Sequence, residues 1–274
     1  MFPLLDKIST ESSNYVINDL GRVKEVYPNL EVFELNYNWS PDIEDSITPV
    51  IKFEWEVLNK RLGQLHVSGA ERILSIGGGG NSPTLDYISN FLEYLCVLNP
   101  SERDLETYSK RTRLDNRILL VRGVGEMIPF RDESFDLVEI TSALDHCHDH
   151  RKVLEESYRV LEENGKVAIT GGNNQSWYRN LVAYLKIPFR DVHDHHHTIH
   201  LEPIMLHDLL TSVGFCDIQI TTNYFLKLPK SIEKLFGSRI ALKVYGLISN
   251  NVLPKIFGSH KGGMLLISAT KKKP

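Results

Sequence analysis

The chain has 274 residues, of which 42% are hydrophobic and 24% charged, and its formal net charge is −4 at pH 7. A chain of this length buries a core without help from disulfides or a structural metal. Its three cysteines are too few for a disulfide framework, so we expect a reducing, cytoplasmic setting. No stretch approaches the roughly 20 apolar residues of a membrane-spanning helix. The acidic balance also argues against nucleic acid as the main partner, because phosphate-binding surfaces are basic.

Short apolar runs alternate with amphipathic stretches, which predicts strand–helix units. We expect residues 1–68 to form a mostly helical cap, with its clearest helix at 47–62, in front of one larger domain, 69–274. The predicted strands of that domain are 72–76, 94–98, 116–121, 135–140, 166–170, 215–221 and 264–269. A helix over 151–161 is expected to stop at Asn164-Gly165. The alternation predicts a doubly wound α/β sheet with helices on both faces.

A glycine-rich turn, Gly77-Gly78-Gly79-Gly80, directly follows the first of these strands. Glycine lets the backbone turn tightly and approach a ligand without a Cβ in the way. By itself this turn fits two interpretations, a nucleotide-type ligand site or a plain strand-to-helix turn.

Three further motifs follow in order: Gly125-Glu126-Met127-Ile128-Pro129-Phe130, then Ser134-Phe135-Asp136-Leu137-Val138, then Tyr158-Arg159-Val160-Leu161 up to Gly165. Together with the glycine turn they resemble the class I S-adenosylmethionine-dependent methyltransferases, in particular the type 11 group, over about residues 68–222. The resemblance implies a Rossmann-like sheet of seven strands whose last strand, about 262–270, is antiparallel. It also implies methyl transfer from S-adenosylmethionine to a small-molecule acceptor, for which we expect a natural product or a glycan or lipid-linked molecule.

The resemblance places the cofactor across the carboxyl ends of the strands. The candidate cofactor-binding residues are then Ser75, Gly77, Gly78, Gly79, Asn99, Val124, Gly125, Glu126, Met127 and Thr141. Some positions depart from the family pattern. The family has an acid at the position of Ser75, a ribose-binding acid at that of Asn99 and an adenine-binding acid at that of Val124, while Asn81 replaces the third glycine of the turn. These changes predict weaker cofactor binding, which restoring an acid at residue 99 should tighten. They leave open an alternative, a degenerate pocket in a binding or regulatory module.

Eight of the eleven histidines fall in two stretches, 146–150 and 193–200. His146 follows the fourth strand of the domain, where substrate should lie, and His196 and His197 lie in a region that often forms a lid in the family. Imidazole is the side chain best matched to proton transfer near neutral pH, so these three are candidate catalytic bases. Packing roles remain open for each. The spacing matches no recognised ligand pattern, so we expect no metal.

Residues 226–262 lengthen the connection between the last two strands and have helical periodicity. Residues 227–262 carry seven lysines and arginines against Glu233 alone, a formal charge of +6. One interpretation is a helix pair on the sheet edge, with its apolar face inward and its lysines solvated. The other is a lid or membrane-surface helix that serves an anionic or lipid-linked substrate, with residues 36–39 as an opposite aromatic wall.

Overall fold

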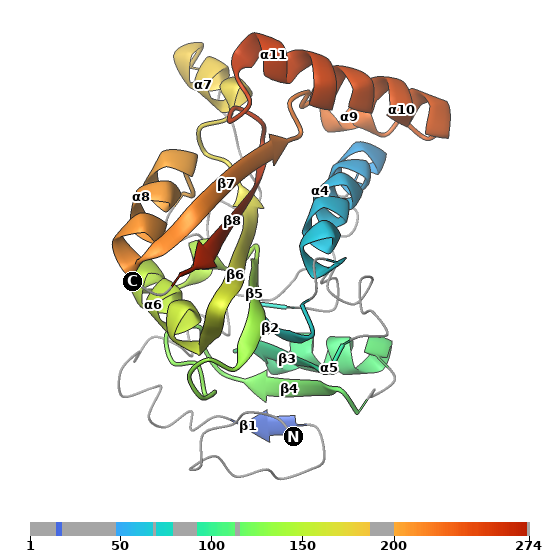
Figure 1. Ribbon diagram of the computed structural model, residues 1–274. Helices are drawn as coiled ribbons and strands as arrows, with labels where there is room; N and C mark the ends of the chain where they lie inside the picture. The colour runs from blue at the N-terminus through green and yellow to red at the C-terminus, as the bar shows by residue number, and fades with distance from the viewer. Residues whose placement is uncertain are drawn as a thin grey trace.

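The computed structural model describes residues 48–67, 70–78, 92–112, 116–186 and 200–272, and the backbone of 15–17. One sheet with the strand order β1-β4-β3-β2-β5-β6-β8-β7 runs through these residues (Figure 1). Its strands are β1 (Tyr15–Ile17), β2 (Arg72–Ile76), β3 (Tyr94–Asn99), β4 (Ile118–Arg122), β5 (Phe135–Thr141), β6 (Leu161–Gly172), β7 (Phe215–Asn223) and β8 (Met264–Lys271).

The strands from β1 to β6 are parallel, and β8 lies between β6 and β7, antiparallel to both. Ile267 of β8 pairs with Ile169 on one side and with Ile220 on the other. This arrangement confirms the predicted doubly wound sheet with an antiparallel last strand. Beyond the seven predicted strands, the three-residue β1 pairs with β4, within the region that we predicted to be mostly helical.

Two apolar cores lie on opposite faces of the sheet because alternate residues of each strand point to opposite sides. On one face, Leu74 and Cys96 pack with α6 (His150–Val160) and α8 (Pro203–Val213). On the other face, Ile73 and Leu95 pack with α4 (Pro49–Val67) and α5 (Glu102–Thr112). Figure 1 shows these helix pairs on the two sides of the strands. The helix predicted at 47–62 corresponds to α4.

The helix before β6 ends earlier than predicted. Its last residue is Val160, and Leu161 already has extended backbone angles. The carbonyls of Arg159 and Val160 accept from the N–H groups of Glu133 and Ser134, so the loop before β5 satisfies the helix end. Asn164-Gly165 lies instead within β6, where the pairing with β5 shifts in register and Asn164 has a φ of 68°.

The segment between β7 and β8 forms α9 (Lys230–Glu233), α10 (Arg239–Leu247), a π-helical turn η3 (Ile248–Val252) and α11 (Leu253–Phe257). The predicted inward apolar face is wrong for much of this segment, because Ile240, Val244 and Leu247 are exposed. Its inner face is held by polar contacts, in which Ser249 donates to Glu54 of α4. None of the helices in the described part of the chain is long and apolar enough to cross a membrane.

Candidate functional site

A pocket lies at the carboxyl ends of β2, β3, β4 and β5, where the strand order reverses. In doubly wound sheets this is the position at which ligands bind. The last residues of β2 and β3 and the loops that follow the four strands supply its lining: Ile76, Gly77, Leu98, Asn99, Pro100, Gly123, Val124, Gly125, Glu126, Ala143, His146, Cys147 and His148. The lining combines apolar side chains with a few polar ones, as small-molecule sites do.

Most of the predicted site residues meet in or beside this pocket. Met127 lies in the turn below it, where its N–H donates to the Val124 carbonyl at 3.2 Å. Ser75 and Thr141 are not in its lining, and their buried hydroxyls have no hydrogen-bond partner among the residues that the structure describes. Gly79, Asn81, His196 and His197 lie outside the described residues, as does the proposed aromatic wall at 36–39.

Two residues of the glycine turn, Gly77 and Gly78, pack too closely against their neighbours to carry a Cβ. Gly77 has a φ of +72°, and a Cβ there would lie 2.2 Å from the Cβ of Ala143. A Cβ on Gly78 would lie 2.7 Å from Ser75 Oγ. The Gly77 N–H donates to the Leu98 carbonyl at 2.8 Å, which fixes the turn against the end of β3. The turn therefore needs glycine for its own path, whatever ligand it faces.

Asn99 has a second role that the sequence did not reveal. Its Nδ2 donates to the Gly78 carbonyl at 3.1 Å, and its Oδ1 accepts from the Ser101 N–H at 2.8 Å. The side chain thus links the glycine turn to the loop after β3. A carboxylate cannot donate to Gly78, so an acid at residue 99 would lose this link and face a carbonyl oxygen instead. We therefore expect an acid at residue 99 to weaken cofactor binding, whereas the family pattern alone predicts tighter binding.

Glu126 positions the loop that carries the pocket histidines. Its carboxylate accepts from the backbone N–H of His148 at 2.8 Å and of Asp149 at 3.3 Å. Asp149 in turn caps α6, where it accepts from the Lys152 N–H at 2.9 Å. Glu126 is buried and lines the pocket, so it joins the loop after β4 to the loop after β5.

His146 ends a single 3₁₀ turn, η2 (Leu144–His146), directly after β5. Its N–H donates to the Ala143 carbonyl at 3.0 Å, and its half-buried side chain lines the pocket. His148 lines the same pocket, whereas His150 begins α6, where burial lowers its pKa. Two imidazoles of the first histidine stretch are thereby brought to the site.

Cys147 also lines the pocket, but its chemistry is not that of a nucleophile. Burial raises the pKa of its thiol well above the ordinary value, and the negative charges of Glu126 and Asp145 raise it further. Its Sγ donates to the Ala143 carbonyl at 3.3 Å. Only the thiolate is a strong nucleophile, so this environment does not favour covalent catalysis by Cys147.

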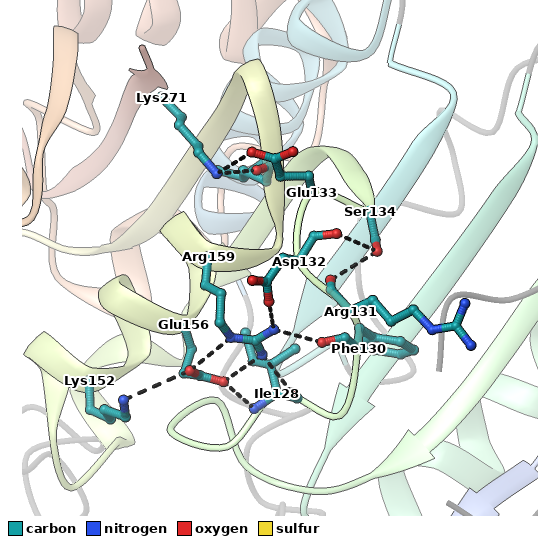
Figure 2. A network of polar contacts seen from close by, with 11 residues as sticks. Ile128, Phe130, Arg131, Asp132, Glu133, Ser134, Lys152, Glu156, Arg159 and Lys271 are labelled. Atoms are coloured by element: carbon teal, nitrogen blue, oxygen red, sulfur yellow. Dashed lines mark hydrogen bonds and ion pairs between the residues drawn. The ribbon is translucent and has the colours of Figure 1, made fainter. Parts of the chain in front are cut away.

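Arg159 gives the run of residues between 128 and 134 a structural role (Figure 2). Its guanidinium donates to the carbonyls of Ile128 at 2.9 Å and Phe130 at 2.8 Å. It also pairs with Asp132 at 2.7 Å and with Glu156 at 2.8 Å. One planar cation therefore fixes the loop below the pocket onto α6.

Asp136 has a similar structural role at the opposite end of β5. It accepts from the backbone N–H of Arg72 at 2.8 Å and pairs with the Arg72 guanidinium at 2.6 Å, while that guanidinium also contacts Glu162. Burial would raise the pKa of Asp136, but hydrogen bonds with Glu162 and from Arg72 lower it below its ordinary value. The Ser-Phe-Asp motif therefore joins β2 to β5 and does not reach the pocket.

No group of three or more His, Cys, Asp or Glu side chains in the described ranges is arranged to hold a metal ion. The pocket fits an adenosine-type cofactor better. Leu98 and Val124 offer apolar contact to a base, and the Asn99 side-chain oxygen keeps one lone pair for a sugar hydroxyl.

A doubly wound sheet with a ligand pocket at its switch point defines the Rossmann-like class of cofactor-binding proteins. A family model described as a methyltransferase domain matches residues 74–169. Residues 74–169 are thus similar to a methyltransferase domain, which agrees with the resemblance of the ordered motifs to the class I S-adenosylmethionine-dependent methyltransferases.

Three comparisons illustrate the relationship. The 27-O-demethylrifamycin SV methyltransferase of Amycolatopsis mediterranei is 22% identical over 160 residues, which cover 56% of this chain and 57% of that protein. The demethylmenaquinone methyltransferase of Lactobacillus johnsonii is 26% identical over 177 residues, 58% of this chain and 66% of that one. A solved S-adenosylmethionine-dependent methyltransferase of Thermotoga maritima, a possible histamine N-methyltransferase, has a TM-score of 0.54 at 19% identity and covers 80% of this chain and 93% of its own. The chain thus spans less than two thirds of the length of these curated relatives.

Proposed function

We propose that this protein transfers the methyl group of S-adenosylmethionine to a small-molecule acceptor of natural-product, glycan or lipid-linked type. The observation that carries the proposal is the pocket at the carboxyl ends of the strands, which is lined by apolar side chains and by His146. Two relatives that resemble the chain are named for small acceptors, a rifamycin and a demethylmenaquinone.

When bound, the sulfonium of S-adenosylmethionine supplies an electrophilic methyl group. The protein then has to hold the acceptor in line and remove its proton. We assign the sugar to Asn99, the base to the surface of Val124 and the backbone at 125–127, and the turn at 77–79 to the remainder of the cofactor. His146 takes the proton of the acceptor on a ring nitrogen, and His196 and His197 remain candidates for the same step.

Val124 offers a sharp test of this assignment. If adenine lies against residue 124, Val124→Asp should add an acceptor for the adenine amine and tighten S-adenosylhomocysteine binding, measured by calorimetry. Val124→Asn is the matched control, because its amide has a similar size but only a neutral oxygen to offer, and neutral hydrogen bonds are weaker. Equal weakening in both variants would place adenine elsewhere.

The competing function is a methyltransferase-like module that acts without the cofactor. The residues that favour it are Ser75 and Val124, since neither supplies the charge found in the family pattern. Calorimetry on the unmodified protein decides between the two. Absence of binding to both S-adenosylmethionine and S-adenosylhomocysteine would favour the module.

The same proposal includes a cytoplasmic setting and no role for nucleic acid. It is supported by three free cysteines, Cys96, Cys147 and Cys216, and by the acidic net charge.

A further inference from the structure

Exposed apolar side chains gather on one end of the molecule. Of the thirteen large hydrophobic side chains that are exposed in the described part of the chain, twelve lie within residues 181–185 and 232–257. The most exposed include Tyr184 at 83%, Leu235 at 79% and Ile240 at 77%. The thirteenth is Ile204 of α8. We call the exposed apolar residues of these two segments the apolar face.

The outward direction of these side chains is fixed by what lies on the inner side. Along α10, Ile240, Val244 and Leu247 are exposed, whereas Tyr245 is buried and donates to the Leu226 carbonyl at 2.7 Å. Gly246 packs on Phe53 so closely that a Cβ would lie 2.6 Å from the ring. The helix therefore cannot rotate its apolar side inward.

Two buried carboxylates hold this inner side. Glu54 of α4 accepts from Ser249 at 2.9 Å and from Asn250 at 3.0 Å. Glu233 accepts from Thr48 at 2.7 Å and from Tyr224 at 2.9 Å. The inner side of the segment is thus occupied by these carboxylates and by an apolar cluster around Tyr245, Phe236 and Phe53, while a second set of apolar side chains faces solvent.

The two parts of the apolar face are physically joined. Trp177, at the start of α7 (Trp177–Tyr184), stacks on Phe257 of α11 with ring centroids 4.3 Å apart and an interplanar angle of 4°. Figure 1 shows α7 beside α11, with α10 continuing the same helical row beyond the end of β7. Because α7 follows β6 and α9 follows β7, both leave the sheet at the edge that bears the pocket.

The charges around this face have one sign. Lys230, Lys234, Arg239, Lys243 and Lys255 are exposed, and Glu233, the acid of this segment, is 1% exposed. A second copy of the chain docked here would bring like charges together with no carboxylate from residues 227–262 to pair them. An apolar surface rimmed by cations instead complements a layer of anionic headgroups over acyl chains.

We infer that the apolar face docks onto an anionic lipid bilayer. The apolar side chains enter the boundary between headgroups and acyl chains, and the five exposed cations contact lipid phosphates. Given the proposed methyl transfer, this docking brings the pocket edge of the sheet toward acceptors that partition into the bilayer, and so favours a lipid-linked acceptor.

The test is flotation of the whole protein with vesicles of phosphatidylcholine alone or with added phosphatidylglycerol, at low and high salt. We expect binding to the anionic vesicles that weakens with salt. Lys243→Gln with Lys255→Gln should weaken it by about 30-fold, since each cation near an anionic surface contributes roughly a fivefold factor. Ile240→Asp with Val244→Asp should weaken it at least as much, because apolar burial is lost as well.

Ile204→Asp is the matched control, since Ile204 is equally exposed but lies outside the apolar face, and it should bind vesicles like the unmodified protein. Absence of binding to anionic vesicles, or binding that survives Ile240→Asp with Val244→Asp, would overturn the inference. So would a dimer in light scattering that the same double variant converts to monomer. Calorimetry with S-adenosylhomocysteine on these variants distinguishes membrane docking from methyl transfer. Loss of vesicle binding with intact cofactor binding would show that the substitutions affect the apolar face and not the pocket.

Discussion

Asn99 links the two loops that border the pocket. Its amide donates to the Gly78 carbonyl and to the Asp104 carboxylate, and its oxygen accepts from the Ser101 N–H and keeps one lone pair. A residue at the homologous position that only accepts would organise the two loops differently. Asn99 thus departs from the acid of the family pattern, and its amide supplies a hydrogen bond to the glycine turn that an acid could not donate.

We predict that Asn99→Asp weakens S-adenosylhomocysteine binding by about tenfold, the effect of losing one hydrogen bond and gaining a repulsive contact of roughly 1–2 kcal/mol. The dissociation constant from calorimetry is the measurement. Asn99→Ala serves as the comparison, since it removes the same link without adding a charge. Tighter binding in the Asp variant would show that the ribose contact outweighs the link to Gly78.

His146 lines the pocket and is our proposed general base. We predict that His146→Ala lowers the turnover of an accepted hydroxyl substrate by about 10²–10⁴-fold, the usual contribution of a base, while the dissociation constant of S-adenosylhomocysteine stays unchanged. Release of S-adenosylhomocysteine is the readout.

His207→Ala is its control, because His207 is exposed on α8 beside Asp208. A loss of less than about tenfold in His146→Ala would mean that positioning alone drives the reaction, or that His196 or His197 removes the proton.

At the scale of elements, α4 is tied to the far end of the chain by Glu54. The carboxylate accepts from Asn223 at 2.8 Å, from the Tyr224 N–H at 3.2 Å, and from Ser249 and Asn250. These partners come from β7 and from the π-helical turn. Ser249 and Asn250 of the π-helical turn both donate to this carboxylate, so the turn helps to hold the segment after β7 against α4.

We predict that Glu54→Ala lowers the free energy of unfolding by about 2–4 kcal/mol, because several buried donors lose a charged acceptor. Urea unfolding is the measurement. Glu56→Ala on the exposed side of α4 should change it by less than about 0.5 kcal/mol. An equal, small effect in both variants would mean that the segment after β7 is held by its other contacts.

The pH dependence of the Glu54 contribution follows from its environment. Burial raises the pKa of Glu54 above its ordinary value of 4.5, although hydrogen bonds from Asn250, Ser249 and Asn223 oppose the rise. A raised pKa means that the contribution of Glu54 is fully present below about 4.5 and declines as the pH rises through the folded-state pKa. The loss caused by Glu54→Ala should therefore be smaller at neutral pH than in mild acid.

At the scale of the whole molecule, the three cysteines lie in different parts of the fold and differ in burial. Cys96 is fully buried in β3, Cys147 is half-buried in the pocket lining, and Cys216 is half-buried in β7. Burial raises the pKa of the first two thiols well above the ordinary value.

We predict that a thiol reagent labels Cys216 first in the native protein, Cys147 slowly and Cys96 only after unfolding. Mass spectrometry of digested protein gives the order. Saturating S-adenosylhomocysteine should slow the labelling of Cys147 and leave that of Cys216 unchanged. Protection of both thiols would point to a general tightening of the fold and away from occupancy of the pocket.

The sheet was predictable from the sequence because its strands are buried on both faces, and such strands are continuous apolar runs such as 72–76 and 94–98. The sequence did not predict which face of the helices in 226–262 turns toward the domain and which toward solvent. A helical period separates two faces, but the choice of inner face depends on Glu54, which is 195 residues away from Ser249 in sequence. Only the folded chain brings them together.

The site was predictable in its location and only partly in its contacts. The motifs placed Gly77, Gly78, Val124 and His146 at one edge, and the structure brings them to one pocket or its border. The motif residue Arg159, however, binds loop carbonyls, and nothing in a local pattern identifies carbonyls as its partners. Backbone groups carry no sequence signature, so such contacts stay invisible until the loop path is known.

The position of β8 between β6 and β7 has a consequence for synthesis on the ribosome. β8 is made after both of its neighbours, so β7 has no partner in the sheet while 224–263 are being added, and the facing edge of β6 stays open as well. Unpaired apolar strand edges are prone to join other chains. During this interval the nascent chain is a natural client for a chaperone, and slow translation of the connecting segment would lengthen its exposure.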